Sequence, residues 1–356
     1  MQLYKCQTCG QLLFFDNTLC VRCRSPLGYL PDAGVLSTLH PVGVGVWRAS
    51  AKPGQIYRRC ANADHVACNW LVPGSTPTRF CRACELNQLV PDLGNPANLK
   101  LWQGLERAKH QLVYALLRLK LPVASREVEP ATGLAFVFVA DPLNPAPGVK
   151  PLPTGHLNGV ITINLSEADD AEREKRRKAL SEPYRTLLGH FRHESGHYYW
   201  QRLVAGRPAH KEFRRLFGDE QADYGQSLKA YYRNGPAPDW QTAFVSAYGS
   251  AHPMEDFAET WAHYLHILDT LDTATAYGIS VRPAVANDPS LSMTADFDPY
   301  TQLEFGRIIA AWLPLTYALN SLNHSMGHGQ FYPFVLVPKV ADKLRFLHAL
   351  VRGELG

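Results

Sequence analysis

The sequence predicts an α+β protein in which a small, β-rich domain organised by metal precedes a larger, mostly helical domain with a small sheet. Three observations support this prediction. All eight cysteines lie before residue 85, most of them in C-x2-C pairs. Two compact apolar segments, Leu134–Ala140 and Val160–Leu165, are rich in β-forming residues and are joined by a Pro/Gly-rich loop. Helical periodicity dominates the remainder, and 356 residues suffice for about two domains.

The cysteines predict two structural zinc sites within residues 1–95. Each set contains C-x2-C spacing, which is typical of tetrahedral thiolate zinc sites. The first set is Cys6, Cys9, Cys20 and Cys23, and the second is Cys60, Cys68, Cys81 and Cys84. Disulfides are the alternative, but residues 1–10 contain no apolar signal segment, and the spacing favours metal. Such a region would have a thin core, so we expect its fold to depend on the two ions.

Charge argues against nucleic acid as a partner. Residues 1–100 hold ten Lys and Arg against five Asp and Glu. Each four-thiolate zinc centre adds two negative charges, which leaves a net charge of about +1. No apolar segment approaches the roughly 20 residues that a membrane span needs, and no targeting signal is visible. We therefore expect a cytoplasmic protein without a membrane contact; the sequence leaves its oligomeric state open.

The second predicted domain, residues 96–356, begins after the Pro/Gly-containing segment 91–96. Its first helix is expected over Leu99–Leu119, and its last over Val340–Val351. The strand predicted at Val160–Leu165 has two possible positions. At a sheet edge it would pair with an extended peptide, whereas in the sheet interior it would be structural.

The segment His193-Glu194-Ser195-Gly196-His197 has the HExxH pattern. On a helix starting near Ser181–Pro183, both imidazoles share one face and can bind one Zn²⁺, while Glu194 lies beside the metal and can act as general base. Gly196 in mid-helix costs about 1 kcal/mol relative to alanine, which predicts a close approach by another backbone. We expect His190 in the core or supporting the site rather than on the metal.

A catalytic zinc needs a third protein ligand, and the segment His252–Tyr264 offers one. Pro253 marks a helix start, and Glu255 and Glu259 share a face at i, i+4. Glu255 is the predicted third ligand, and Glu259 is expected to accept the free ring N–H of a ligand histidine. The alternative is an amphipathic helix with solvated acids, its core stripe supplied by Phe257, Trp261 and Leu265. We expect Asp256 to be solvated.

The segments TLLGHFRHESGHYYW, LFGDE and SAYGSAHPMEDFAETWAHYLH, together with the cysteine pattern, resemble the bacterial family of zinc-binding metallopeptidases with an N-terminal zinc ribbon. The resemblance covers nearly the whole chain and implies a zincin-like catalytic domain. Tyr248, seven residues before Glu255, also resembles part of the second zinc-binding helix of anthrax lethal factor. That likeness implies that Tyr248 donates a hydrogen bond to the oxyanion, a role that suits a phenol held near a metal.

Three functions are compatible with these features. The first is a zinc endo- or aminopeptidase with one catalytic and two structural zinc ions, acting on a peptide or protein, with the ribbon recruiting substrate or partner. The second is a nucleic-acid-associated protease resembling the SprT-like repair proteases, against which the weak charge and the acidic third ligand argue. The third is a binding module whose zincin core is catalytically idle.

Overall fold

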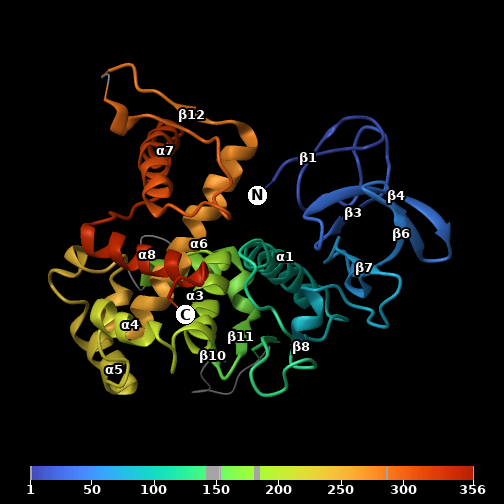
Figure 1. Cartoon of the computed structure of the whole chain (residues 1–356). Coiled ribbons are helices and arrows are strands. Elements are labelled where there is room, and N and C mark those ends of the chain that lie inside the picture. Colours follow the sequence, from blue (N-terminus) through green and yellow to red (C-terminus); the bar gives the residue numbers. More distant parts are fainter. Residues whose placement is uncertain (1, 142–151, 153, 180–184, 286–287, 356) are drawn as a thin grey trace. The chain divides into compact units, whose positions relative to one another are not determined.

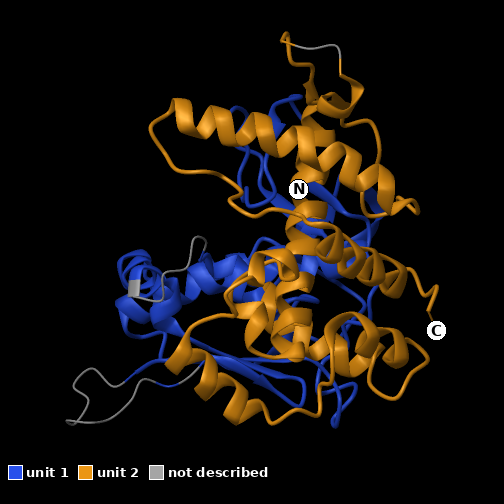
Figure 2. Ribbon diagram, turned by 90° about the vertical axis from the view of Figure 1, so that its left-hand side faces the viewer, with its two compact units in different colours: residues 1–191 blue, residues 192–356 orange. Residues whose placement is uncertain are grey.

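The computed structural model describes residues 2–141, 152, 154–179, 185–285 and 288–355. The expected helix start at Ser181–Pro183 lies outside the described residues. The chain forms two compact units, residues 1–191 and 192–356, which are coloured separately in Figure 2. A β-rich N-terminal region with two four-cysteine clusters is followed by a mostly helical region with a small sheet (Figure 1), which confirms the predicted α+β class.

The first unit opens with a zinc-ribbon-like region made of short antiparallel strands. β1 and β2 pair as a two-stranded sheet, and the next five strands form a sheet in the order β3-β4-β5-β6-β7. A bridge between Tyr29 and Trp70 brings β3 beside the start of β7, so the five-stranded sheet curls back on itself. The bounds are β1 Tyr4–Lys5, β2 Leu12–Leu13, β3 Leu27–Leu30, β4 Val35–Gly43, β5 Val46–Ala49, β6 Lys52–Arg59 and β7 Leu71–Pro73.

A second sheet in this unit has the order β10-β11-β9-β8. The predicted strands are present as β9 (Ala135–Val139) and β11 (Val160–Asn164), which pair in parallel. β11 is interior, because β10 (Gly155–Leu157) pairs with its other side, so the edge position considered for β11 is wrong. β8 (Asn87–Leu89), which begins three residues after Cys84, pairs with β9.

The helices of the first unit begin with α1, Pro96–Arg118, close to the predicted span. Asn95 caps α1 by accepting the N–H of Ala97, and Pro96 occupies the first turn, where its missing N–H costs no hydrogen bond. The charged helix α2 (Asp170–Ala179) follows, and α3 (Leu187–Leu203) begins in this unit and continues into the second.

α1 and the ribbon strands share one aromatic core. The ring centroid of Tyr114 on α1 lies 5.3 Å from that of Phe15 and 6.5 Å from that of Tyr29, and the tilted ring of Trp70 lies 4.9 Å from that of Tyr29. All four side chains are buried. Aromatic burial of this extent makes a large contribution to stability, so the ribbon strands and α1 stabilise each other.

The second unit is almost entirely helical after α3. Its longest helix, α6, is capped at the start by His252 and ends at Gly278, which adopts the left-handed conformation (φ 63°) common after helices. Within the described residues, no helix is long and apolar enough to cross a membrane. The remaining bounds are α4 Ala209–Phe217, α5 Tyr224–Asn234, α6 Pro253–Tyr277, β12 Ser280–Val281, β13 Met293–Thr294, α7 Phe305–Ser325 and α8 Pro338–Val351.

Candidate active site

Helices α3 and α6 lie in direct contact at Gly196. A Cβ atom added there would lie 2.8 Å from the Cα of Ala258 and 3.2 Å from the Cβ of Trp261. The predicted close approach at Gly196 is therefore confirmed. Phe257, Trp261 and Leu265 on α6 are fully buried, as expected for a core stripe. The absence of a side chain at Gly196 sets the short distance between the two helices that carry the predicted metal ligands.

The start of α6 is fixed by His252. Its Nδ1 accepts the N–H of Met254, so its Nε2 carries the proton and donates to the carbonyl of Ala222 at 3.0 Å. Pro253 follows in the first turn. This double anchor places Glu255 in the first turn of α6, facing α3.

The structure brings together His193, His197 and Glu255. The Nε2 atoms of His193 and His197 lie 3.0 and 3.5 Å from the two carboxylate oxygens of Glu255. Zinc ligands at about 2.0–2.1 Å in a tetrahedron lie about 3.4 Å from each other, so these distances suit one shared ion. Glu255 is 1% exposed, and its Oε2 is buried with no hydrogen-bond partner. A cation would satisfy this oxygen, so the donor set fits zinc.

Glu259, one turn after Glu255, contacts the ring nitrogen of His193 that does not face Glu255. Its Oε1 accepts the Nδ1–H of His193 at 2.6 Å, and its Oε2 accepts the hydroxyl of Ser246 at 2.6 Å. This contact leaves the Nε2 lone pair of His193 directed at Glu255 and the candidate metal position. Burial raises the pKa of Glu259, but the hydrogen bond and charge of His193 outweigh it and lower the pKa on balance.

Tyr248 lies beside His193. Its ring centroid is 6.0 Å from that of His193 and 5.7 Å from that of Tyr231. Burial, followed by the negative charge of Glu255, raises the pKa of Tyr248 well above its ordinary value. The phenol therefore keeps its proton at neutral pH and remains able to donate a hydrogen bond.

Tyr224, at the start of α5, was not predicted from the sequence. Its hydroxyl donates to Oε1 of Glu255 at 2.7 Å, and its ring packs edge-on against His252 at 5.2 Å. Burial, and then the charge of Glu255, raises its pKa. Asp223 before it is a recognisable helix cap, but no periodicity connects Tyr224 to a glutamate 31 residues later.

Glu194 follows His193 on α3 and is half-buried. Its negative charge contributes to the raised pKa of Tyr224, which places its carboxylate in the same electrostatic environment as the cluster. His190, one turn earlier, lies apart from the cluster: its Nδ1 is 3.1 Å from the buried carboxylate of Glu167. His190 is therefore not part of the metal cluster, as expected, but its contact is with Glu167 and not with a residue of that cluster.

The expectation that Asp256 is solvated is wrong. Asp256 is fully buried, and its Oδ2 accepts from the ammonium group of Lys343 on α8 at 2.6 Å. Lys343 also donates to the carbonyl of Ala243 at 2.7 Å. One buried cation therefore ties the first turn of α6 to α8 and to the segment before Tyr248.

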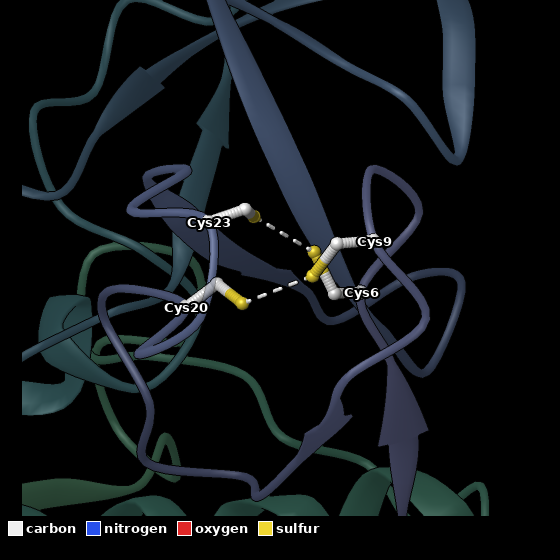
Figure 3. A group of neighbouring side chains, drawn as sticks. All are labelled: Cys6, Cys9, Cys20 and Cys23. Carbon is white, nitrogen blue, oxygen red and sulfur yellow. Dashed lines mark hydrogen bonds between the residues drawn. The ribbon is translucent and has the colours of Figure 1, made fainter.

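The first cysteine cluster joins two similar turns (Figure 3). The Sγ atoms of Cys6 and Cys23 are 3.5 Å apart, and those of Cys9 and Cys20 are 3.7 Å apart. These separations exceed a disulfide bond of about 2.05 Å and suit the edges, about 3.8 Å, of a four-thiolate zinc tetrahedron. All four cysteines are free thiols in the structure, and they fit a structural zinc.

The second cluster, Cys60, Cys68, Cys81 and Cys84, is fully buried. The Sγ atoms of Cys68 and Cys81 are 3.6 Å apart. Backbone N–H groups of Trp70 and Cys81 point to the Sγ atoms of Cys68 and Cys60 at 3.3 and 3.4 Å. Donors aimed at sulfur favour the thiolate form, so this cluster also fits a metal.

Two family profiles match the chain. Residues 98–350 match the family described as "Putative zinc-binding metallo-peptidase", and residues 3–95 match a zinc-ribbon domain. The chain belongs to this metallopeptidase family. The family indicated by the sequence motifs is thereby confirmed, whereas the division into domains of residues 1–95 and 96–356 stays a prediction.

Relatives of this metallopeptidase family member occur in mycobacteria. An uncharacterized protein of Mycobacterium tuberculosis is 42% identical over 352 residues, covering 99% of this chain and 95% of the relative. An uncharacterized protein of Mycobacterium bovis matches with the same identity and coverage. No solved structure matches the chain.

Proposed function

We propose that this chain is a zinc-dependent peptidase that hydrolyses peptide bonds in a peptide or protein substrate. The observation that carries the proposal is the buried carboxylate of Glu255, whose Oε2 has no hydrogen-bond partner and lies 3.0 Å from Nε2 of His193, while its Oε1 lies 3.5 Å from Nε2 of His197. Two imidazoles and one carboxylate leave a fourth position open, as catalytic zinc sites require. Zinc held there would lower the pKa of water to about 7 and polarise a substrate carbonyl.

Residues of the chain perform the remaining steps of the proposed reaction. Glu194 takes the proton from the attacking water and passes it to the leaving amine. Tyr248 donates its O–H to the oxygen that becomes negatively charged in the tetrahedral adduct. Tyr224 donates to Oε1 of Glu255 and so helps to orient the carboxylate that would hold the metal, while Glu259 holds the ring of His193.

The ribbon would recruit substrate or a protein partner, since its net charge after zinc binding is small. A cytoplasmic location also stays a prediction. The competing functions are a nucleic-acid-associated protease and a binding module without catalytic activity. Each predicts experimental results that differ from those expected of the proposed peptidase.

Zinc content tests the metal site directly. The purified chain should contain about three zinc ions, and Glu255→Ala should contain about two with both ribbon ions retained. Glu172→Gln, an exposed acid on α2, is the control. Two zinc ions in the unmodified chain, with no change in Glu255→Ala, would support the binding module instead.

Hydrolysis is tested with Glu194→Gln, which should keep fold and zinc but lose turnover by about 10²–10⁴-fold. Because the substrate is unidentified, the probe is a proteome-derived peptide library in which new amino termini are counted. Cleavage by the unmodified chain and not by Glu194→Gln supports the proposal. Equal cleavage by both proteins would exclude Glu194 as the general base.

A further inference from the structure

Helix α1 brings a fifth metal-binding side chain to the second cysteine cluster. The Nε2 of His110, which is 4% exposed, lies 3.2 Å from the Sγ of Cys68, 3.6 Å from that of Cys84 and 3.9 Å from that of Cys81. The zinc-ribbon profile ends at residue 95, so it does not include this histidine. The three sulfur atoms and the nitrogen all belong to the first unit.

The protonation of the His110 ring follows from its other nitrogen. Nδ1 lies 2.6 Å from the backbone carbonyl of Glu106, and because a carbonyl only accepts, Nδ1 carries the proton. In the neutral ring, Nε2 then has a lone pair directed at the three sulfur atoms. A histidine that binds metal through one nitrogen and donates to a backbone carbonyl through the other is the usual arrangement at zinc sites.

The distances also suit a ligand. With Zn–S of about 2.3 Å and Zn–N of about 2.0–2.1 Å, sulfur and nitrogen ligands of one tetrahedral zinc lie about 3.6 Å apart. The three distances from Nε2 scatter around this value, and the 3.6 Å between Cys68 and Cys81 is close to the expected sulfur–sulfur separation. We propose that the second structural zinc is bound by Cys68, Cys81, Cys84 and His110, with Cys60 buried beside it but not bound to it.

A four-cysteine site with Cys60 shares three of these ligands, so the two arrangements differ only in the fourth. If zinc took Cys60, Nε2 of His110 would face the thiolates of Cys68, Cys81 and Cys84, and the ring would need a second proton to donate to them. Binding the metal through Nε2 needs no second proton.

Charge in the interior favours the same choice. Glu106 is fully buried, its Oε2 lies 3.4 Å from the Sγ of Cys84, and its Oε1 accepts from Lys109 at 2.7 Å. Lys109 and Glu106 neutralise each other. With a neutral His110 in both arrangements, a zinc with three thiolates and one imidazole has a formal charge of −1, whereas four thiolates give −2, and the smaller charge is less costly to bury.

Cadmium NMR on the intact, unmutated chain distinguishes the two arrangements. ¹¹³Cd substituted into the ribbon gives a separate resonance for each site, and replacing one thiolate by an imidazole moves the resonance upfield. We expect one resonance in the four-thiolate range, from Cys6, Cys9, Cys20 and Cys23, and one in the range of three thiolates and one nitrogen. Two four-thiolate resonances would overturn the proposal.

Zinc content of paired variants gives an independent test. His110→Ala should lose one zinc, His110→Cys should retain it by supplying a thiolate, and Cys60→Ser should keep all three. Cys68→Ser, which removes a ligand in either arrangement, is the control that should lose one. Retention of three ions by His110→Ala, or loss of one by Cys60→Ser, would contradict the assignment.

Discussion

The Nδ1–H of His193 donates to Oε1 of Glu259 across 2.6 Å, and this single contact selects which ring nitrogen faces Glu255. The sequence predicts that Glu259 accepts from a ligand histidine, because it lies one turn after Glu255 and zinc-bound histidines often donate to a carboxylate. The second oxygen of Glu259 is held by Ser246, so the carboxylate has little freedom to rotate. The contact links the orientation of a candidate metal ligand to the segment that precedes Tyr248.

Glu259→Gln should weaken zinc binding at the catalytic site by about 10–100-fold, because the ring of His193 loses its charged acceptor. Affinity is measured by competition with a chromophoric chelator after the ribbon sites are saturated. Glu172→Gln is the matched control. Unchanged zinc affinity in Glu259→Gln would show that His193 is oriented by other contacts.

The two tyrosines at the site should differ in what they affect. Tyr248→Phe should keep zinc and lower kcat by about 10²-fold, since one lost oxyanion donor costs about 3 kcal/mol. Tyr224→Phe should instead weaken zinc binding, because Oε1 of Glu255 loses the donor that orients it. Tyr317→Phe, an exposed tyrosine on α7, should change neither quantity. A drop in zinc affinity for Tyr248→Phe would assign it to the metal instead.

Gly196→Ala should destabilise the second unit by about 1–3 kcal/mol, because the new methyl group would lie 2.8 Å from the Cα of Ala258 and force α3 away from α6. Urea unfolding measures the loss. Gly306→Ala, a glycine in α7 with no atom near the added Cβ, should be neutral or slightly stabilising. Equal stability of the two variants would mean that the helices can separate without cost.

Glu167 should make the stability of the first unit pH-dependent. Burial alone raises its pKa, but His190 and then Arg185 and Arg176 outweigh it and lower the pKa to about 2, from 4.5. The folded state therefore binds the proton less tightly than the unfolded state. The stabilisation is complete above pH 4.5 and declines as the pH falls toward 2.

Urea midpoints measured between pH 7 and pH 3 check this expectation for Glu167. Glu167→Gln should be less stable at pH 7 and should lose less stability on acidification than the unmodified chain. Glu172→Gln should follow the unmodified chain throughout. Parallel acid profiles for Glu167→Gln and the unmodified chain would contradict the prediction.

The parts of the site that could be predicted from the sequence are those encoded by local spacing. His193 and His197 share a helix face, as do Glu255 and Glu259, and Pro253 marks where α6 begins. The strands β9 and β11 were predictable from compact apolar segments. These features need only a few neighbouring residues, so a single sequence reveals them.

The parts that could not be predicted depend on partners far along the chain. From the pattern of its own helix, Asp256 is expected to be exposed to solvent. Its burial depends on an ion pair with Lys343, which lies 87 residues later in the chain. Tyr224 contacts Glu255, which lies 31 residues later in the chain. β10 has only three residues and lies next to Pro and Gly. His110 lies in a correctly predicted helix, but nothing in the pattern of that helix relates it to the cysteines.

The aromatic core that joins Tyr114 to Phe15, Tyr29 and Trp70 has a consequence for how this protein can be dissected. A fragment cut at the boundary between the two matching profiles would strip α1 of its apolar cover and expose a tyrosine that is now 1% accessible. The ribbon therefore cannot be removed without exposing the apolar surface of α1. Exchanging ribbons between relatives should succeed only when α1 is transplanted with them.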